Sequence, residues 1–518
     1  MIPMNKVVKG VTLSTAALLS TTGLIACSQQ TNNESAAPSS TKQNESVTIK
    51  MFRNYPAPEY PKGGGVGRQE ILKSLEAAGL KGIDFDVSLA TGPDYFTKLN
   101  LLAASGELPD YFNLDIPTMS RFADEGLIAP LDDLIKQAPN AMSLFDPKDL
   151  EALKYKGKLY ALPVGYRPEP FNGPNTGTFI IRQDWLDNLG LKPPKTLDEL
   201  HDVLVAFTKN DPDKNQANDT YGLGGIKPNN MDPNFGAIFG AFGVIPSFWH
   251  ERNGQLKQGM VLPETKEALT LLQKWYKEGI IDPESLVTER KQLEEKIINS
   301  KVGVFEGLTM DVDPKQPLGN SLRKVTPTAK FNFLTPPTGA KGLSGWPENP
   351  PAYNDIRAVS AKFKNPEALM KLINWSVSDK PDGGFYLVTY GKENQHYTYD
   401  KAKNRISQNV KSYSELYEQG YSNPVRFLQV VDRRWTADET IVALESANKN
   451  LVRNSFWKTV PAQFDYPDLG KLWAEYYSKI ISGTYSIDKW DEFVQKYYQQ
   501  GGKIIEDQVN AEWNKTKK

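Results

Sequence analysis

The chain has 518 residues, of which 39% are hydrophobic and 24% are charged, and this is enough to build the cores of two domains. Its formal net charge is −1, so no overall basic field is present to attract nucleic acid or an anionic membrane. One cysteine and three histidines exclude an internal disulfide framework and a cysteine-based zinc site, and they disfavour a histidine-rich metal site.

The first 27 residues have the pattern of an export signal. Residues 11–26 are apolar or small without a charge, follow two lysines, and end at Cys27. The letters Leu-Ile-Ala-Cys at this point resemble the lipobox of bacterial lipoproteins, in which the cysteine receives a lipid and becomes the new N-terminus. We therefore expect a signal peptide at 1–26, and a lipidated Cys27 with a flexible polar tether at 27–46. The alternative is an uncleaved membrane anchor, which the short run rich in Ser, Thr and Gly disfavours.

The folded part begins with alternating strand and helix patterns. Residues 47–52 have the pattern of a strand, and residues 71–78 carry apolar side chains at helical spacing. In residues 83–89 apolar and polar side chains alternate, which predicts a second strand. A helix through 96–102 and a short apolar run at 111–114 follow. This order predicts an α/β lobe.

Four further helices carry clear signals. Thr196 and Glu199 have the capping-box spacing before an apolar face that extends to Phe207. The others are predicted over 268–275, closed by a glycine at 279, over 366–373 after an Asn-Pro start, and over 490–497.

Three irregular stretches rich in Gly, Pro and Asn lie at 163–177, 335–354 and 380–395. Because strand and helix patterns appear on both sides of each, we interpret them as crossings between two lobes. The predicted lobes are discontinuous: 47–165 with 352–445 form lobe 1, and 166–351 with 446–518 form lobe 2.

The order of several short motifs resembles the family-1 extracellular solute-binding proteins of ABC sugar importers, in particular the oligosaccharide-binding lipoproteins of Gram-positive bacteria. The motifs are the lipobox and the segments 104–110, 157–163, 181–186, 189–191, 194–199 and 301–305. The resemblance implies an α/β, two-lobed periplasmic-binding-protein-like (type II) fold with a hinge and a ligand cleft between the lobes. It implies recognition by an ABC permease and no catalysis.

A sugar has apolar C–H faces and a rim of hydroxyls, so its site needs aromatic surfaces and planar polar groups. The chain contains 10 Trp, 23 Tyr and 22 Phe, and several lie near the predicted crossings. Each of these aromatics has an alternative role in the core. The resemblance places Asn113 and Asp115 where the first lobe meets its ligand. The candidate ligand-binding residues are Tyr55, Asn113, Asp115, Tyr166, Arg167, Trp249, Trp346, Tyr353, Arg357 and Trp435.

Residues 211–219 place oxygen-bearing side chains at alternating positions, which is the pattern of a calcium loop. It resembles a loop found in this branch of the binding proteins. Gln216 stands where a glycine is expected, and Thr220 stands where related loops carry a glutamate. A solvated polar turn is therefore the alternative to a structural Ca²⁺ site. The candidate ligands are Asp211, Asp213, Asn215, Asp219 and a backbone carbonyl near Ala217.

Two other functions stay open. A glycoside hydrolase would act on the same sugars, and carboxylate pairs are unavoidable among 62 acidic residues. No nucleophile elbow, phosphate loop or metal-binding histidine pair occurs in the sequence. A peptide-binding lipoprotein or adhesin would share the export signal without the ordered motifs. The expected protein is a monomeric solute-binding lipoprotein, not an enzyme, on the outer face of the membrane.

Overall fold

The computed structural model describes residues 46–54, 61–145, 147–166, 177–228, 234–350, 355–412, 414–426, 428–429, 434 and 436–517. Two larger sheets occur within this part of the chain, and each is packed in its own hydrophobic core.

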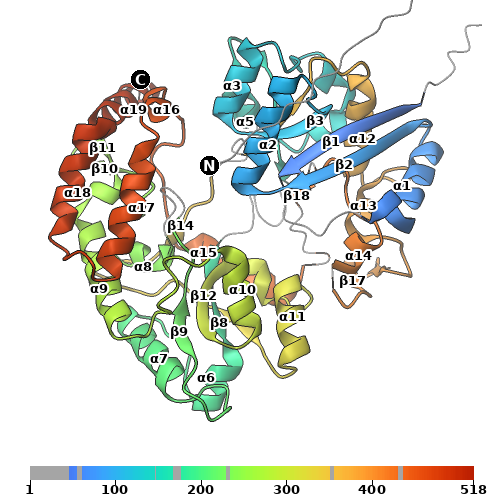
Figure 1. Cartoon of the computed structure of the whole chain (residues 1–518). Coiled ribbons are helices and arrows are strands. Elements are labelled where there is room, and N and C mark those ends of the chain that lie inside the picture. Colours follow the sequence, from blue (N-terminus) through green and yellow to red (C-terminus); the bar gives the residue numbers. More distant parts are fainter. Residues whose placement is uncertain are drawn as a thin grey trace, which may run out of the picture. The chain divides into compact units, whose positions relative to one another are not determined.

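The first sheet has the strand order β2-β1-β3-β15-β6. β1 pairs in parallel with β2 and β3 (Figure 1). β15 runs antiparallel to both β3 and β6. A segment from the second half of the chain therefore lies inside a sheet begun by the first half. The bounds are β1 (Val47–Asn54), β2 (Ile83–Ala90), β3 (Tyr111–Leu114), β15 (Ile356–Val359) and β6 (Leu162–Pro163).

Helices α1 (Gly65–Ala77) and α2 (Gly92–Ser105) connect the first three strands, so the predicted strand-helix-strand unit is confirmed. α1 buries Ile71 and Leu75 in the same core as Ile49 of β1. Helices α12 (Pro366–Val377) and α13 (Phe385–Tyr390) complete this core with residues such as Trp375.

The second sheet has the order β13-β8-β12-β9. β12 runs antiparallel to β8 and parallel to β9, and β13 runs antiparallel to β8. Its core combines residues near the middle of the chain with residues near the C-terminal end, including Trp473 and Trp513. The bounds are β8 (Gly177–Arg182), β9 (Tyr221–Gly224), β12 (Val302–Leu308) and β13 (Phe331–Phe333).

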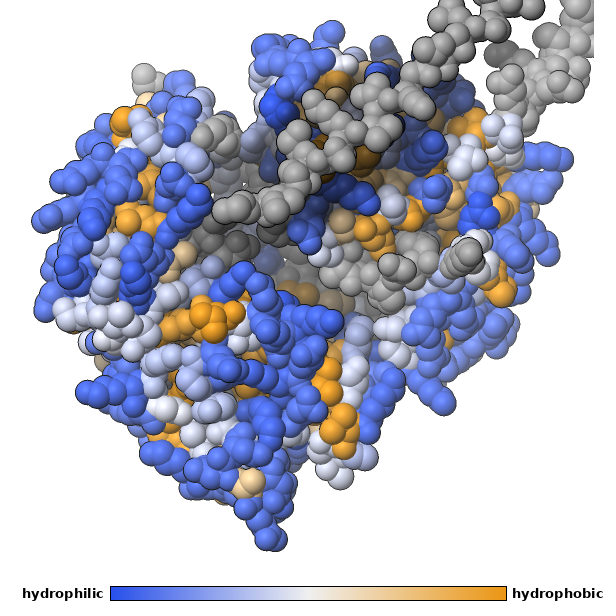
Figure 2. All heavy atoms as spheres, viewed as in Figure 1, coloured by the Kyte–Doolittle hydropathy of each residue, from blue (hydrophilic) through white to orange (hydrophobic). Residues whose placement is uncertain are grey.

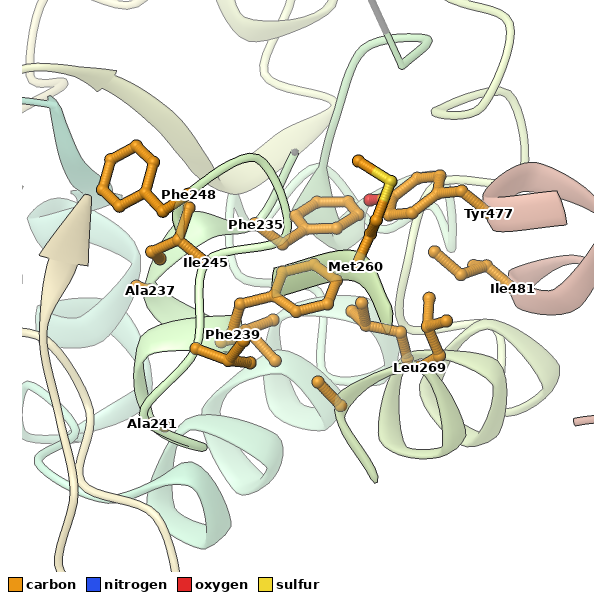
Figure 3. Close-up of a cluster of buried hydrophobic side chains, with 14 of the residues drawn as sticks. Phe235, Ala237, Phe239, Ala241, Ile245, Phe248, Met260, Leu269, Tyr477 and Ile481 are labelled. Carbon is orange, nitrogen blue, oxygen red and sulfur yellow. The ribbon is translucent and has the colours of Figure 1, made fainter. Parts of the chain in front are cut away.

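The helices beside this sheet follow the predicted signals. In α7 (Leu197–Lys209), the Thr196 hydroxyl accepts a hydrogen bond from the Glu199 N–H (3.1 Å), and the Glu199 carboxylate accepts one from the Thr196 N–H (3.3 Å), which confirms the capping box. Figure 3 shows Leu269 of α9 on the side of Ile481 of α17, and Tyr477 of α17 beside Met260, all within the second core. The other helices here are α17 (Asp468–Ile481), α18 (Lys489–Tyr497), α19 (Lys503–Thr516) and α9 (Pro263–Lys277).

Shorter elements fill the rest of the described chain. Other helices are α3 (Ile116–Asp124), α4 (Pro139–Met142), α5 (Pro147–Ala152), α6 (Gln183–Leu189), α8 (Gly236–Gly240), α10 (Arg290–Ile298), α11 (Pro317–Val325), α14 (Ser414–Glu418), α15 (Asp438–Lys449) and α16 (Ala462–Asp465). Short strand pairs are β4 (Lys154–Tyr155) with β5 (Lys158–Leu159), β7 (Gly165–Tyr166) with β18 (Leu428–Gln429), β10 (Trp249–Arg252) with β11 (Gln255–Gln258), β14 (Trp346–Pro347) with β19 (Leu451–Val452), and β16 (Tyr397–Asp400) with β17 (Arg405–Gln408).

Two details of the predicted organisation need correction. The stretch 380–395 is not a crossing, because it contains α13, whose Phe385 and Tyr390 are buried in the first core. The boundary predicted at 445 falls inside α15, and its Ala443 packs with Ile180 and Phe305 of the second sheet. α15 therefore packs against the second sheet, and a boundary at 445 would divide this helix.

The face drawn in Figure 2 is mainly hydrophilic, with small hydrophobic areas. Exposed large hydrophobic side chains such as Val66, Leu101 and Val287 are spread over different parts of the chain, which is usual for a protein surface. Among the described helices, none combines the length and the apolar character that a membrane crossing requires.

Candidate functional site

A polar layer lies at the carboxyl end of β1 and β3, the edge of a parallel sheet at which α/β proteins usually bind ligands. Asn113 and Arg357 are opposite each other in the pairing of β3 with β15, and only 6% and 3% of their surfaces are exposed. The side-chain amide oxygen Oδ1 of Asn113 accepts a hydrogen bond from the Asn54 N–H (3.3 Å). Burial raises the pKa of the neighbouring Tyr95 hydroxyl, which accepts a hydrogen bond from the Asn113 N–H (2.8 Å).

Asp355 joins these two buried side chains. Its Oδ1 accepts a hydrogen bond from the Asn113 amide (3.1 Å), and its Oδ2 accepts one from the Arg357 guanidinium (3.3 Å). The Asp355 side chain is nevertheless 47% exposed. An ionised carboxylate has about four acceptor positions, so this oriented group can receive further hydrogen bonds from a solute.

A cavity of about 1330 Å³ adjoins the same edge of the first sheet. One wall is formed by the end of β2 and the start of α2, and Ala90 in this wall pairs with Asn54 of β1. The opposite wall comes from the second sheet, with the ends of β9 and β12 and the helices α10 and α11. Residues of both cores therefore line one cavity.

Charged groups in the second wall are tied into the fold. The Glu306 carboxylate accepts hydrogen bonds from the N–H groups of Phe235 (2.8 Å) and Gly236 (3.2 Å), and so holds the start of α8. The Arg290 Nε donates to Glu294 (2.9 Å), and its Nη1 donates to the Glu306 backbone carbonyl (2.9 Å). The arginine is thus engaged on two sides within the protein.

Asp311 also lines the cavity. Its carboxylate accepts a hydrogen bond from the Leu308 N–H (2.8 Å), and burial raises its pKa despite that bond. The wall between these groups is aliphatic, with Leu89, Leu308 and Leu318. Such a surface can meet apolar faces of a solute while the carboxylates accept its hydroxyl hydrogens.

The structure brings together only some of the predicted ligand-binding residues. Asn113 and Arg357 meet at Asp355, as described above. The Asp115 carboxylate caps α3 by accepting a hydrogen bond from the Thr118 N–H (2.8 Å). That bond gives Asp115 a role in starting a helix.

The two tryptophans of the predicted set that the structure describes are both buried in the second core. Trp249 is 4% exposed, and Trp346 is fully buried with its ring edge-on to Phe179 at 5.4 Å between ring centroids. This placement favours the packing role over a stacking surface for a solute. Tyr55, Arg167, Tyr353 and Trp435, the side chain of Tyr166, and Cys27 lie outside the described residues.

Sequence reasoning missed Asp355, which lies next to the predicted crossing at 335–354. The sequence signal for Asp355 is its position two residues before Arg357 and directly before the short strand β15. Its second partner, Asn113, is distant in the sequence, so the pair cannot be read from local spacing.

The candidate calcium loop is a tight polar turn after α7. Asp211 accepts hydrogen bonds from the N–H groups of Asn215 (2.9 Å) and Gln216 (3.0 Å). Asp213 has a buried carboxylate oxygen without a hydrogen-bond partner, and burial, followed by the neighbouring Asp211 and Asp219, raises its pKa. Such an unsatisfied oxygen suits a cation.

Other features of the loop fit a cation less well. The Asn215 amide nitrogen donates to Asp213 (3.0 Å) and Asp219 (3.3 Å), whereas a metal needs the amide oxygen. Asp219 forms an ion pair with Lys301, which lowers the Asp219 pKa. In the described part of the chain, no three His, Cys, Asp or Glu side chains are grouped closely enough to hold a metal ion.

A smaller hollow of about 770 Å³ lies on the outer side of α10. It is lined by residues of the second sheet's surroundings alone, and two of its cations, Lys296 and Lys301, are paired with Asp282 and Asp219. Unlike the larger cavity, it has no wall from the first sheet among the described residues.

Comparison with known proteins agrees with this architecture. A model of the bacterial extracellular solute-binding protein family matches residues 73–382. The chain is 26% identical over 459 residues to the polygalacturonan/rhamnogalacturonan-binding protein YtcQ of Bacillus subtilis, covering 85% of this chain and 86% of YtcQ. It is 29% identical over 263 residues to lipoprotein LipO of the same organism, covering 50% and 49% of the two chains.

A solved structure extends the likeness over the whole fold. The structure of an EF-hand mutant of the ABC-transporter substrate-binding protein FusA from Streptococcus pneumoniae, in complex with fructo-nystose, superposes with a TM-score of 0.71 at 19% identity. The alignment covers 91% of this chain and 99% of that chain. The α/β fold is therefore the two-lobed, periplasmic-binding-protein-like fold, with one lobe around each sheet. The chain belongs to the bacterial extracellular solute-binding protein family.

Proposed function

We propose that the protein captures a soluble oligosaccharide reversibly in the large cavity and presents it to the permease of an ABC importer. The observation that carries this proposal is that the cavity walls come from both cores in a chain of the solute-binding family. YtcQ and FusA, whose names and titles include saccharides, support the choice of substrate class. The protein acts as a carrier and not as an enzyme.

The chemistry of the site fits a sugar. Asp355 offers an oriented, half-exposed carboxylate, and carboxylates accept hydrogen bonds from hydroxyl groups. Aliphatic side chains of the cavity supply contact for C–H faces. Aromatic stacking is assigned to the predicted residues that lie in the undescribed segments, namely Tyr55, Tyr166, Tyr353 and Trp435, with Arg167 as a polar contact.

Calorimetry of the purified protein against soluble oligosaccharides tests this function. Asp355→Asn should lower the affinity about fivefold to tenfold, because a hydrogen bond to a charged acceptor is stronger than one to a neutral acceptor by about 1 kcal/mol. Asp86→Asn is the matched control, an exposed carboxylate in β2. Chromatography of the same mixtures should show uncleaved sugar, and cleavage would establish a hydrolase instead.

The two lobes are proposed to close on the bound sugar, since a ligand that contacts both walls favours the state in which both contacts exist. We place lobe 1 at 47–165 with 352 to about 437, and lobe 2 at 166–351 with the remainder, which differs from the sequence-based boundary only at α15. Small-angle scattering should show a smaller radius of gyration in the presence of a bound sugar. An unchanged radius would contradict closure.

The protein is proposed to be a monomer held at the outer face of the membrane by a lipid on Cys27. The lipobox supports this location, as does the likeness to lipoprotein LipO. In cell fractionation, Cys27→Ala should appear in the medium or as an unprocessed precursor. If Cys27→Ala is processed and retained like the wild type, the proposed lipid anchor is wrong.

We further propose that Asp211, Asp213, Asn215 and Asp219, with a backbone carbonyl near Ala217, hold a structural Ca²⁺ ion. The support is the unsatisfied Asp213 oxygen and the EF-hand named in the FusA structure. Metal analysis and melting with and without a chelator test the site, with Asp213→Asn as the variant. Absence of bound calcium together with an unchanged melting temperature would refute it.

A further inference from the structure

We propose that Lys301 competes with Ca²⁺ for the carboxylate of Asp219, so that either the lysine ammonium or the metal balances the negative charge of the loop at 211–219. This inference rests on the proposed calcium site and adds the residue that sets its affinity. Lys301 is not part of the loop. It lies 82 residues after Asp219 in the sequence, directly before β12, and its Nζ forms an ion pair with the Asp219 carboxylate.

The loop gathers negative charge at one point. The Asn215 amide nitrogen donates hydrogen bonds to both Asp213 (3.0 Å) and Asp219 (3.3 Å), so these two carboxylates face a common donor. Asp211 belongs to the same turn and accepts two backbone N–H groups of the loop. One oxygen of Asp213 is buried without a hydrogen-bond partner among the described residues. Carboxylates gathered in this way repel one another, and a cation among them relieves the repulsion.

The Lys301 ammonium provides such a cation. It contacts Oδ2 of Asp219, while the Asn215 amide contacts Oδ1 of the same carboxylate. Both oxygens of Asp219 are therefore engaged by N–H donors, whereas a calcium ligand must turn at least one oxygen to the metal. Rotation of the Asn215 amide can free Oδ1. An ammonium that stays on Oδ2 then lies one carboxylate away from a divalent ion and repels it.

The backbone fixes the base of the Lys301 side chain beside the loop. The Lys301 carbonyl accepts a hydrogen bond from the Tyr221 N–H (2.8 Å), and the Lys301 N–H donates to the Lys296 carbonyl (2.8 Å). The two side chains of the ion pair are nevertheless 38% and 39% exposed. The ammonium can therefore turn into solvent when Ca²⁺ binds, and an ion pair this exposed contributes little to stability. Lys301 thus weakens calcium binding without blocking it.

The consequence is a loop whose charge is balanced at low and at high calcium. Where Ca²⁺ is scarce, the lysine holds Asp219 in place. Where Ca²⁺ is plentiful, the metal replaces the lysine. Calcium sites of extracellular modules bind with dissociation constants of about 10⁻⁴–10⁻³ M, and an internal competitor moves a site toward this weak range.

Titration calorimetry with CaCl₂ tests the competition in the full exported chain, after a chelator has been added and removed. Lys301→Gln should bind Ca²⁺ about tenfold more tightly than the wild type, because a positive charge next to the divalent ion is lost. Lys301→Arg keeps the charge and should stay within about twofold of the wild type. The matched control is Lys214→Gln, which removes an exposed lysine of the loop itself. Its effect should be about twofold or less and should vanish at about 300 mM KCl.

Thermal melting shows whether the lysine stabilises the loop when calcium is withheld. With a chelator present, Lys301→Gln should melt at a lower temperature than the wild type, because the carboxylates lose their cation. Saturating Ca²⁺ should remove or reverse this difference, since the metal then balances the loop in both proteins.

Labelling of lysines with an N-hydroxysuccinimide ester, followed by mass spectrometry, detects the displacement in the wild type itself. Ca²⁺ should raise the reactivity of Lys301 and leave that of Lys257 unchanged, because Lys257 is paired with Glu506 outside the loop. Calcium binding by Lys301→Gln alone would support the inference. Equal calcium affinities of the wild type and Lys301→Gln would overturn it while keeping the calcium site. No calcium binding by either protein would refute the calcium site and this inference with it, whereas the carrier function is decided by sugar binding.

Discussion

Replacement of Trp346 by alanine tests whether this tryptophan packs in the core or stacks on the ligand. The Trp346 ring is fully buried, and it packs edge-on against Phe179 with an interplanar angle of 89°. A tryptophan buries about 150–250 Å², and at about 25 cal/mol per Å² its transfer contributes about 4–6 kcal/mol. Measured truncations of buried aromatic residues to alanine cost about 3–5 kcal/mol. We therefore expect Trp346→Ala to destabilise the second lobe by about 4 kcal/mol.

For a lobe of this size the loss corresponds to a melting temperature lower by about 8–16 °C. Differential scanning calorimetry measures the melting temperature, and titration calorimetry with a bound oligosaccharide measures the affinity. Trp457→Ala, a half-buried tryptophan beside the same core, is the matched control and should cost less. The core assignment of Trp346 is wrong if Trp346→Ala keeps the melting temperature of the wild type and loses affinity for the sugar.

Two further changes test the packing and the charges of the second lobe. Gly240→Ala should destabilise the protein by about 1–3 kcal/mol or more, because the added Cβ would lie 1.9 Å from the Gly345 carbonyl oxygen. Gly319→Ala is the control and should be tolerated, because its added Cβ would have no atom closer than 3.4 Å. Equal melting temperatures of the two variants would contradict this packing argument. Glu492 has its pKa lowered from 4.5 to about 2, chiefly by a hydrogen bond from Lys489. Its contribution to stability is therefore present above pH 4.5 and is lost as the pH falls toward 2. In acid denaturation followed by circular dichroism, Glu492→Gln should remove this part of the pH dependence of stability. A variant whose unfolding at low pH is identical to that of the wild type would argue against the pairing of Glu492 with Lys489.

Features set by neighbours in the sequence were predictable. The β1-α1-β2 unit follows from hydrophobic periodicity, and the capping box of α7 follows from two side chains three residues apart. The motif at 181–186 also has a local cause, since Arg182 donates to Asp184 through Nε (2.9 Å) and Nη2 (2.6 Å) and lies over the Trp185 ring.

Features set by distant contacts were not predictable. Gly383 and Gly384 suggested an irregular crossing, but a Cβ at Gly384 would lie 2.6 Å from the Trp375 ring, so the glycine permits close packing of α13. Trp346 stands in a stretch rich in Gly and Pro, yet Phe179 and the pairing of β14 with β19 bury it. In the same way, the orientation of Asp355 depends on Asn113, which periodicity and spacing alone do not connect to it.

The insertion of β15 between β3 and β6 fixes an order of events during biosynthesis. A ribosome or an export channel releases the chain from its N-terminus, so β1, β2 and β3 emerge long before β15 arrives to pair with β3. Until then β3 has an open edge, which can pair with the strands of other chains. A truncation near residue 340 would leave that edge open permanently, and such a fragment should aggregate. We therefore expect the chain to need protection from association with other chains until its last third has been delivered.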